Sequence, residues 1–210
     1  MPDQRLEGVP PGLPAVPVRS KELLILRAFL HFEATSLGRF GFPIEVAWVF
    51  EDGAEESHLI RPAAGWNDWD PDPKTPQAIP RERLAVDGEP VEAVALRLAE
   101  QLGGQTVFAS APFWDCKWLA LLLRSAGLSP CAIQLVDIDV GLLELAGAIL
   151  APSLPSSAIP RATRRILADV SARFAAACRT YRALPDARME RERWFAVSEL
   201  AHAFDLEAAL

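Results

Sequence analysis

The order of extended and helical patterns along the chain predicts an α/β protein with a mixed sheet. Three extended runs come first, at residues 24–33, 44–50 and 58–61, and Glu51-Asp52-Gly53 between the second and third is a hairpin turn signal. Helical and extended patterns then alternate along the rest of the chain. We therefore expect a five-stranded sheet, with its first three strands antiparallel and helices on both faces.

The later elements follow from apolar spacing and from residues that end helices. Residues 62–80 hold five prolines and should form a structured loop. Residues 90–102 carry apolar side chains at a helical period, and Gly103-Gly104 ends that helix. The remaining expected elements are strands at 106–109 and 132–136 and helices at 115–126, 140–150, 161–182 and 189–208.

Composition predicts one domain. The chain has 210 residues, half of them apolar, which is enough for one good core at residues 20–184. Residues 1–19 contain five prolines and are expected to be a disordered arm, with a helical extension at 185–210. No apolar run approaches the ~20 residues that span a bilayer, and no signal peptide is visible. The three cysteines have no CxxC spacing, so we expect reduced thiols in a cytoplasmic protein without a membrane partner.

The charge distribution leaves two interpretations open. The net charge is −7, which argues against general adhesion to nucleic acid. Residues 160–193 nevertheless hold nine arginines against four acidic residues, about +5, which leaves about −12 for the rest. This basic segment, which includes Arg165, is either a surface for a polyanion or a solvated helix face.

One acidic residue ends the first apolar strand. It is Glu33, in the segment His31-Phe32-Glu33-Ala34-Thr35-Ser36-Leu37-Gly38. A carboxylate beside a small-residue turn, at the end of a strand, is typical of a metal ligand. The segment resembles the first motif of the DEDD 3′–5′ exonucleases, in which Asp-x-Glu precedes Thr or Ser, a small residue and Leu. Glu33 matches the Glu, whereas His31 stands at the position of the Asp.

Two further segments extend the resemblance over about residues 22–183. Trp114-Asp115 follows a short strand and opens a helix, as the aromatic-Asp pair of the second motif does, although Asp115 could equally be a plain N-cap. The third motif, His-x₄-Asp or Tyr-x₃-Asp, is matched by Arg164 and Asp169, with Arg164 in place of His. The alternative for Asp169 is an exposed ion pair with Arg165.

The resemblance implies an RNase H-like three-layer fold and a two-metal site. Family members hydrolyse a 3′-terminal phosphodiester with two divalent ions, ~3.5–4 Å apart. By resemblance the metal ligands are His31, Glu33, Asp115 and Asp169. A neutral imidazole has one usable lone pair and cannot bridge two ions, so His31 suits Mn²⁺ better than Mg²⁺.

Arg164 removes the expected base, because a guanidinium stays protonated. In one hypothesis, Arg164 or Arg165 neutralises Glu33, Asp115 and Asp169 and replaces the metals. In the other, Arg164 lies on the surface and a weak metal site survives at Glu33 and Asp115.

Three functions follow as expectations. The first is binding of single-stranded nucleic acid 3′ ends or nucleotides, with weak or no hydrolysis. The second is an active, Mn²⁺-preferring 3′–5′ exonuclease on DNA or RNA that uses His31. The third is a protein-interaction scaffold. Trp66 and Trp69, in the polar loop, are candidates for base stacking, and Arg165 for a nucleic-acid contact. The apolar stripe of the final helix should pack either on its own domain or in a homodimer.

Overall fold

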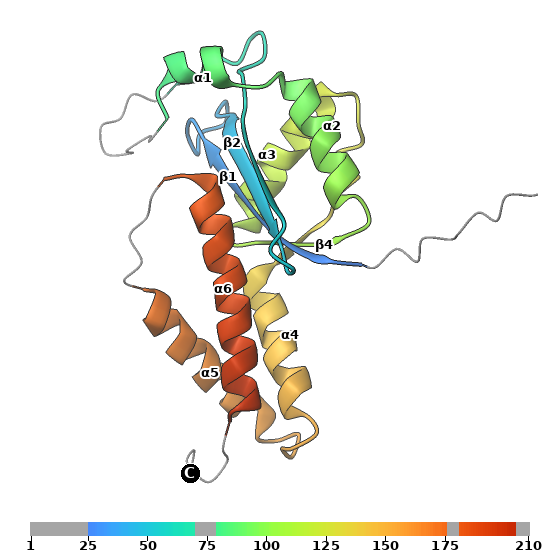
Figure 1. Ribbon diagram of the computed structural model, residues 1–210, viewed down its shortest axis with the longest axis vertical. Coiled ribbons are helices and arrows are strands. Elements are labelled where there is room, and N and C mark those ends of the chain that lie inside the picture. The colour runs from blue at the N-terminus through green and yellow to red at the C-terminus, as the bar shows by residue number, and fades with distance from the viewer. Residues whose placement is uncertain (1–24, 70–78, 176–180, 205–210) are drawn as a thin grey trace, which may run out of the picture.

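The computed structural model describes residues 25–69, 79–175 and 181–204. These residues form a mixed five-stranded sheet in the order β3-β2-β1-β4-β5 (Figure 1). Strands β1 and β2 and strands β2 and β3 are antiparallel neighbours, whereas β4 is parallel to both β1 and β5. The strands are β1 Arg27–Ala34, β2 Pro43–Phe50, β3 Glu55–Leu59, β4 Thr106–Ala109 and β5 Leu135–Asp137. The predicted architecture is confirmed.

The hairpin between β2 and β3 forms where its turn signal predicts. Gly53 has a φ of 96°, a left-handed conformation that glycine adopts without steric cost. Its N–H donates to the Phe50 carbonyl at 2.9 Å, and the Phe50 N–H donates to the Ala54 carbonyl at 2.7 Å. These bonds fix the register of β2 and β3.

Helices cover both faces of the sheet (Figure 1). Helices α2 (Val91–Leu102) and α3 (Pro112–Ser125) pack over one face, with Ala28, Leu30 and Phe32 of β1 beneath them. Helices α4 (Ile138–Leu150) and α6 (Ala183–His202) cover the other face, toward which Phe29 points, and α5 (Ile159–Phe174) packs behind them. The alternation of side chains along β1 therefore supplies both halves of the core.

One described helix has no counterpart in the sequence prediction. Helix α1 (Arg81–Asp87) has seven residues, between Pro80 and Gly88. Only Leu84 of this helix is buried, so the segment has too little apolar periodicity to be recognised.

Four helices begin earlier than expected, and three of them, α3, α5 and α6, have a proline in the first turn. Helix α3 begins at Pro112, and α6 begins at Ala183 with Pro185 in its third position. Proline is tolerated there because N–H groups of the first turn have no acceptor within the helix. The predicted start of α6 at Met189, after Pro185, is therefore wrong.

The apolar stripe of α6 packs within the chain. Trp194 and Val197 are buried, and the Trp194 ring lies 5.8 Å from that of Phe29 and 5.0 Å from that of Phe108. Helix α6 is thus a layer of the fold, and most of the stripe is covered by the chain itself, with Leu200 left exposed. None of the described helices has both the length and the apolar character needed to cross a bilayer. The predicted arm at 1–19 and Cys178 lie outside the described residues.

Candidate functional site

Three elements bring ionisable side chains together at the carboxyl end of β1. His31 and Glu33 alternate along β1 with buried Phe32, so they share the face that α6 covers. The His31 Nε2 lies 3.7 Å from Glu33 Oε1 and 3.4 Å from Asp186 Oδ2, on the first turn of α6. Asp115, from the first turn of α3, is near enough that its charge affects the pKa of His31. We call these four residues the β1 cluster.

Asp115 is held against β1 through the backbone. Its Oδ2 accepts the Ala111 N–H at 3.1 Å, and its carboxylate also accepts the Phe32 N–H. Burial raises the pKa of Asp115 from its ordinary value near 3.8 to about 6. The positive charge of His31 and the two N–H donors oppose this shift, and the Glu33 carboxylate adds to it.

His31 is the one basic side chain of the β1 cluster. Burial alone would lower its pKa, but the side-chain interaction with Glu33 and the charges of Asp115 and Asp186 raise it above the ordinary value for histidine. The Nδ1 atom is buried and has no hydrogen-bond partner among the described residues. Nε2 therefore makes all of the polar contacts of this ring.

A buried carboxylate fixes the first turn of α6. Glu45 lies opposite Glu33 in the β1–β2 register, so both point to the same face. It accepts two bonds from Arg182 Nε, at 3.0 and 3.1 Å, one from Arg182 Nη2 at 2.7 Å and one from the Ala183 N–H at 2.8 Å. Glu45 thus caps the helix that carries Asp186 four residues beyond Arg182. Neither Glu45 nor Arg182 was predicted as a functional residue from the sequence.

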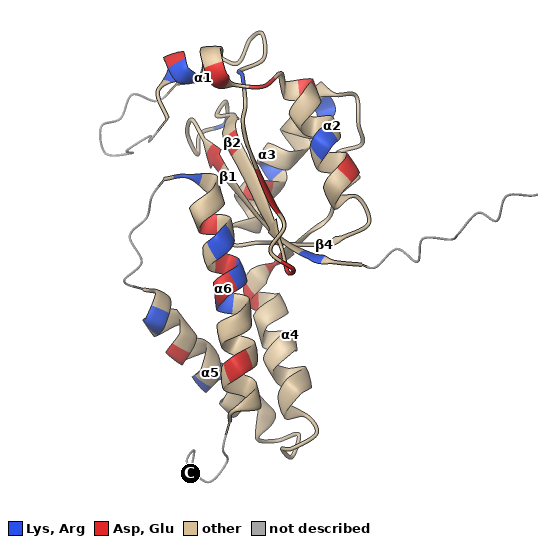
Figure 2. Ribbon diagram, in the orientation of Figure 1, with Lys and Arg blue, Asp and Glu red and all other residues tan. Residues whose placement is uncertain are grey.

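The structure places the expected third motif elsewhere. Arg164, Arg165 and Asp169 are exposed on α5, which packs on α4 and α6 and lies far from the end of β1 (Figures 1 and 2). Neither arginine has an ion pair among the described residues, so the structure does not bring them to Glu33 and Asp115. The hypothesis of a cluster neutralised by Arg164 or Arg165 therefore has no support, since α5 packs chiefly on α4 and α6.

Asp186 is the carboxylate that the sequence analysis missed. Tyr181 and Asp186 have the His-x₄-Asp spacing, with tyrosine in place of histidine, and this spacing was the available signal. Two features made Asp186 hard to recognise in the sequence. Pro185 indicated that a helix would begin only after it, and Arg164 and Asp169 have the same spacing earlier in the chain. Tyr181 has a φ of 52°, uncommon for a residue other than glycine and frequent near functional sites.

The other predicted residues lie in different surroundings. Trp66 is half-buried, and its ring stacks on that of Phe42 at 5.3 Å. Trp69 is half-buried as well and packs against the small cluster that contains Phe42 and Leu84. Both tryptophans therefore have structural contacts, and Trp66 also lines a cavity described below.

The donor set fits one divalent cation better than two. The nearest ligand atoms of His31, Glu33 and Asp186 all lie within 4.8 Å of one another, the one such group among the described residues. One nitrogen and two oxygen donors suit Mn²⁺ or Zn²⁺ more than Mg²⁺. To bind a cation through Nε2, however, His31 must carry its proton on Nδ1. That N–H would be buried without an acceptor, whereas metal-binding histidines usually donate it to one.

Comparison with known proteins identifies the fold. No protein-family model and no curated protein matches the sequence. Among solved structures, Escherichia coli exonuclease I in complex with a dA16 oligonucleotide superposes with a TM-score of 0.57 at 17% identity, covering 83% of this chain and 41% of that chain. The zinc-bound form of the E. coli exonuclease I–ssDNA complex gives 0.54 at 16% identity, covering 84% and 39%. Exonuclease I of the moderately thermophilic Methylocaldum szegediense gives 0.57 at 16%, covering 80% and 40%.

The chain therefore has the RNase H-like fold of the exonuclease I structures, as the resemblance implied. It spans about two fifths of the length of those chains. At this identity the likeness concerns the fold, and the function has to be argued from the β1 cluster itself.

Proposed function

We propose that this protein binds single-stranded nucleic acid through an exonuclease fold and hydrolyses it weakly or not at all. The observation that carries this proposal is the place of His31, whose Nε2 lies between the Glu33 and Asp186 carboxylates. In the family that the sequence resembles, a bridging aspartate stands at this position. Binding is supported by the oligonucleotide bound to a protein of the same fold.

The charge balance of the β1 cluster disfavours two metal ions. Two divalent ions bring four positive charges, and the cluster offers three carboxylates and an imidazole. The imidazole bears no negative charge in either protonation state and cannot bridge two ions. The raised pKa of His31 adds positive charge where cations would bind, which lowers their affinity further.

Were a single cation bound, the Glu33 and Asp186 carboxylates would hold it, and the ion would supply a more acidic water and charge stabilisation. Tyr181 offers a phenol hydroxyl where the family pattern has the imidazole that accepts a proton from water. Two groups of the hydrolytic machinery are thus replaced, each of which ordinarily contributes several orders of magnitude.

A second function is favoured by one observation. The close approach of the His31, Glu33 and Asp186 donor atoms would allow a softer cation such as Mn²⁺ to bind with a nitrogen ligand. The protein would then be an Mn²⁺-preferring 3′–5′ exonuclease.

The test is a gel time course with 5′-labelled single-stranded DNA and RNA in Mn²⁺ or Mg²⁺, beside a filter-binding assay. Asp186→Asn is compared with Asp169→Asn, an exposed carboxylate on α5. We expect the protein to retain labelled oligonucleotide on the filter, and we expect little shortening of the oligonucleotide in any lane of the gel. A ladder that Asp186→Asn abolishes and Asp169→Asn preserves would establish the active enzyme instead. Absence of binding would refute the proposal.

A further inference from the structure

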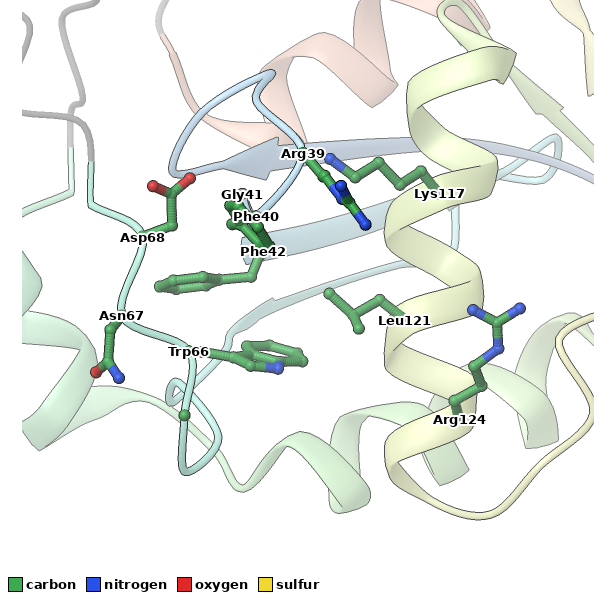
Figure 3. A pocket seen from close by; sticks show the side chains of 11 residues that line it. Arg39, Phe40, Gly41, Phe42, Trp66, Asn67, Asp68, Lys117, Leu121 and Arg124 are labelled. Carbon is green, nitrogen blue, oxygen red and sulfur yellow. The ribbon is translucent and has the colours of Figure 1, made fainter.

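A second candidate site lies on another side of α3 from Asp115. It is a cavity of about 640 Å³ between the loop after β1, the loop around residues 65–68, and α3 (Figure 3). Lys117, Leu121 and Arg124 line it from one face of α3, at i, i+4 and i+7. Because residues two apart on a helix point in different directions, the face with Lys117 is not the face with Asp115.

One wall of the cavity is aromatic. The Trp66 ring is stacked on Phe42, with ring planes 29° apart, and Phe42 is fully buried behind it. Phe40, on the rim, is 74% exposed, an unusual position for so large an apolar side chain. Leu121 faces Trp66 across the hollow (Figure 3). These side chains offer planar, apolar surface of the kind on which nucleobases stack.

The charged side chains around the cavity are mostly cationic. Arg39, Lys117 and Arg124 line it, against the single carboxylate of Asp68. Asp68 accepts the Ser36 hydroxyl at 2.9 Å. Neither Arg39 nor Arg124 has an ion pair within the described part of the chain. An anion is therefore attracted to this hollow although the chain as a whole carries a charge of −7.

The walls of the cavity are held in place. The Lys117 Nζ donates to the Gly38 carbonyl at 2.5 Å and lies 3.9 Å from the centre of the Trp118 ring, and Ser36 joins the two loops through Asp68. A Cβ on Gly41 would lie 2.2 Å from the Ser36 carbonyl oxygen, so the loop closes tightly there. A ligand thus meets a site that is already formed, which limits the entropy lost on binding.

We propose that this cavity binds a nucleoside phosphate, with its base against Trp66 and Phe40 and its phosphate at Arg39 and Arg124. The inference rests on the proposed function, because it assigns a place to one nucleotide unit outside the β1 cluster. The ligand is either a unit of a bound strand or a free nucleotide, since both present a base and a phosphate.

The test measures affinity for a fluorescein-labelled dT12 oligonucleotide and, separately, for dAMP by calorimetry. Arg124→Ala and Phe40→Ala change exposed side chains, so the fold should be retained. We expect each to weaken binding about tenfold, and Arg124→Ala to reduce the slope of log K against log salt by ~0.7. Arg27→Ala, at the opposite end of β1, is the matched control and should change neither value.

The outcomes separate the two proposals. If dT12 binds the wild-type protein and both cavity variants equally, the cavity inference is overturned while the proposed function stands. If dT12 does not bind but Arg124→Ala weakens dAMP binding, the cavity is a free-nucleotide site and the proposed function fails. If dT12 binding weakens and dAMP does not bind, the ligand is a unit of the strand. If neither ligand binds, both proposals fall.

Discussion

His31 decides the chemistry of the β1 cluster because it sets the number of carboxylates. Nδ1 has no hydrogen-bond partner in the described part of the chain and Nε2 faces two acids, so the ring contributes positive charge and a hydrogen-bond donor rather than a cation ligand. Replacing it with a fourth carboxylate should restore the donor set that divalent ions prefer.

We therefore expect His31→Asp to gain affinity for Mn²⁺ and Mg²⁺. Without metal the variant should be less stable than wild type, because four carboxylates then repel one another. Saturating Mn²⁺ should raise its Tm by several degrees, since binding to the folded state alone adds about 2.7 kcal/mol at a hundred times Kd. Scanning calorimetry with and without chelator makes the measurement. His31→Asn, whose side chain is close in size to aspartate but uncharged, should show no such rise in Tm. An equal rise in both variants would contradict a metal site that depends on the added carboxylate.

Asp115 gives the folded protein a pH dependence of definite sign. Its pKa is raised by burial to about 6, so the folded state binds more protons than the unfolded state between about pH 4 and 6. Stability contributed by the protonated form is complete below the ordinary pKa and is lost as the pH rises through 6. The interactions that raise the pKa of His31 act in the same direction, because they too favour a protonated form.

Asp115→Asn should therefore be more stable than wild type at pH 8, by up to about 3 kcal/mol for a shift of about two pKa units. At pH 4 the two proteins should differ little. Urea unfolding of both proteins at pH 4 and at pH 8 gives the free energies of unfolding to be compared. A difference that stays constant from pH 4 to 8 would show that burial of Asp115 is not responsible, and Asp169→Asn, on an exposed helix face, serves as the control.

At the scale of elements, α6 is the helix that completes the site, and arginines attach it to the β2–β3 hairpin. Arg182 pairs with Glu45, Arg188 with Glu55, and Arg191 donates to the carbonyls of Phe50 and Glu51. These pairs explain much of the basic segment in the sequence: on α6 the arginines are bonded within the chain. Those of α5 remain exposed, as expected for a solvated helix face.

The Arg182–Glu45 and Arg188–Glu55 pairs should differ sharply in their contribution to the free energy of unfolding. The Glu45 side chain is 1% exposed, so Arg182→Ala leaves a buried, unpaired charge and should cost about 2–3 kcal/mol after allowance for the half-exposed arginine. Arg188→Ala removes an exposed pair and should cost under ~1 kcal/mol. Chemical denaturation of both variants tests this, and equal losses would show that Glu45 needs no partner.

The sequence was informative wherever a local pattern and the tertiary environment agreed. Strands, the hairpin at Gly53 and the motif residues Glu33 and Asp115 were predicted from apolar runs, turn chemistry and motif order. Asp186 and Glu45 were not, because their roles depend on which helix docks against β1 and β2. Spacing alone could not choose between Asp169 and Asp186, as only tertiary packing excludes α5 from the sheet.

At the scale of the whole molecule, α6 contributes side chains to the hydrophobic core on one face of the sheet. Trp194 joins Phe29 and Phe108 in a three-ring cluster that connects α6 to the centre of the sheet. Trp194→Ala should lower the free energy of unfolding by about 3–5 kcal/mol. Phe195→Ala, at a half-exposed neighbouring position, should have a much smaller effect in the same denaturation experiment. A loss for Trp194→Ala as small as that for Phe195→Ala would mean that the contacts of Trp194 are not essential to the core.

The bond between Arg182 and Glu45 joins positions 137 apart in the chain. A contact of such long range closes a large loop. The conformational entropy of that loop must be lost before the contact can stabilise the chain. We expect this closure to follow formation of the β1–β2–β3 meander, so that the β1 cluster is assembled in the last steps of folding. Arg182→Ala should then speed unfolding and leave the refolding rate almost unchanged in stopped-flow measurements. A matching fall in the refolding rate would instead place α6 in the folding nucleus.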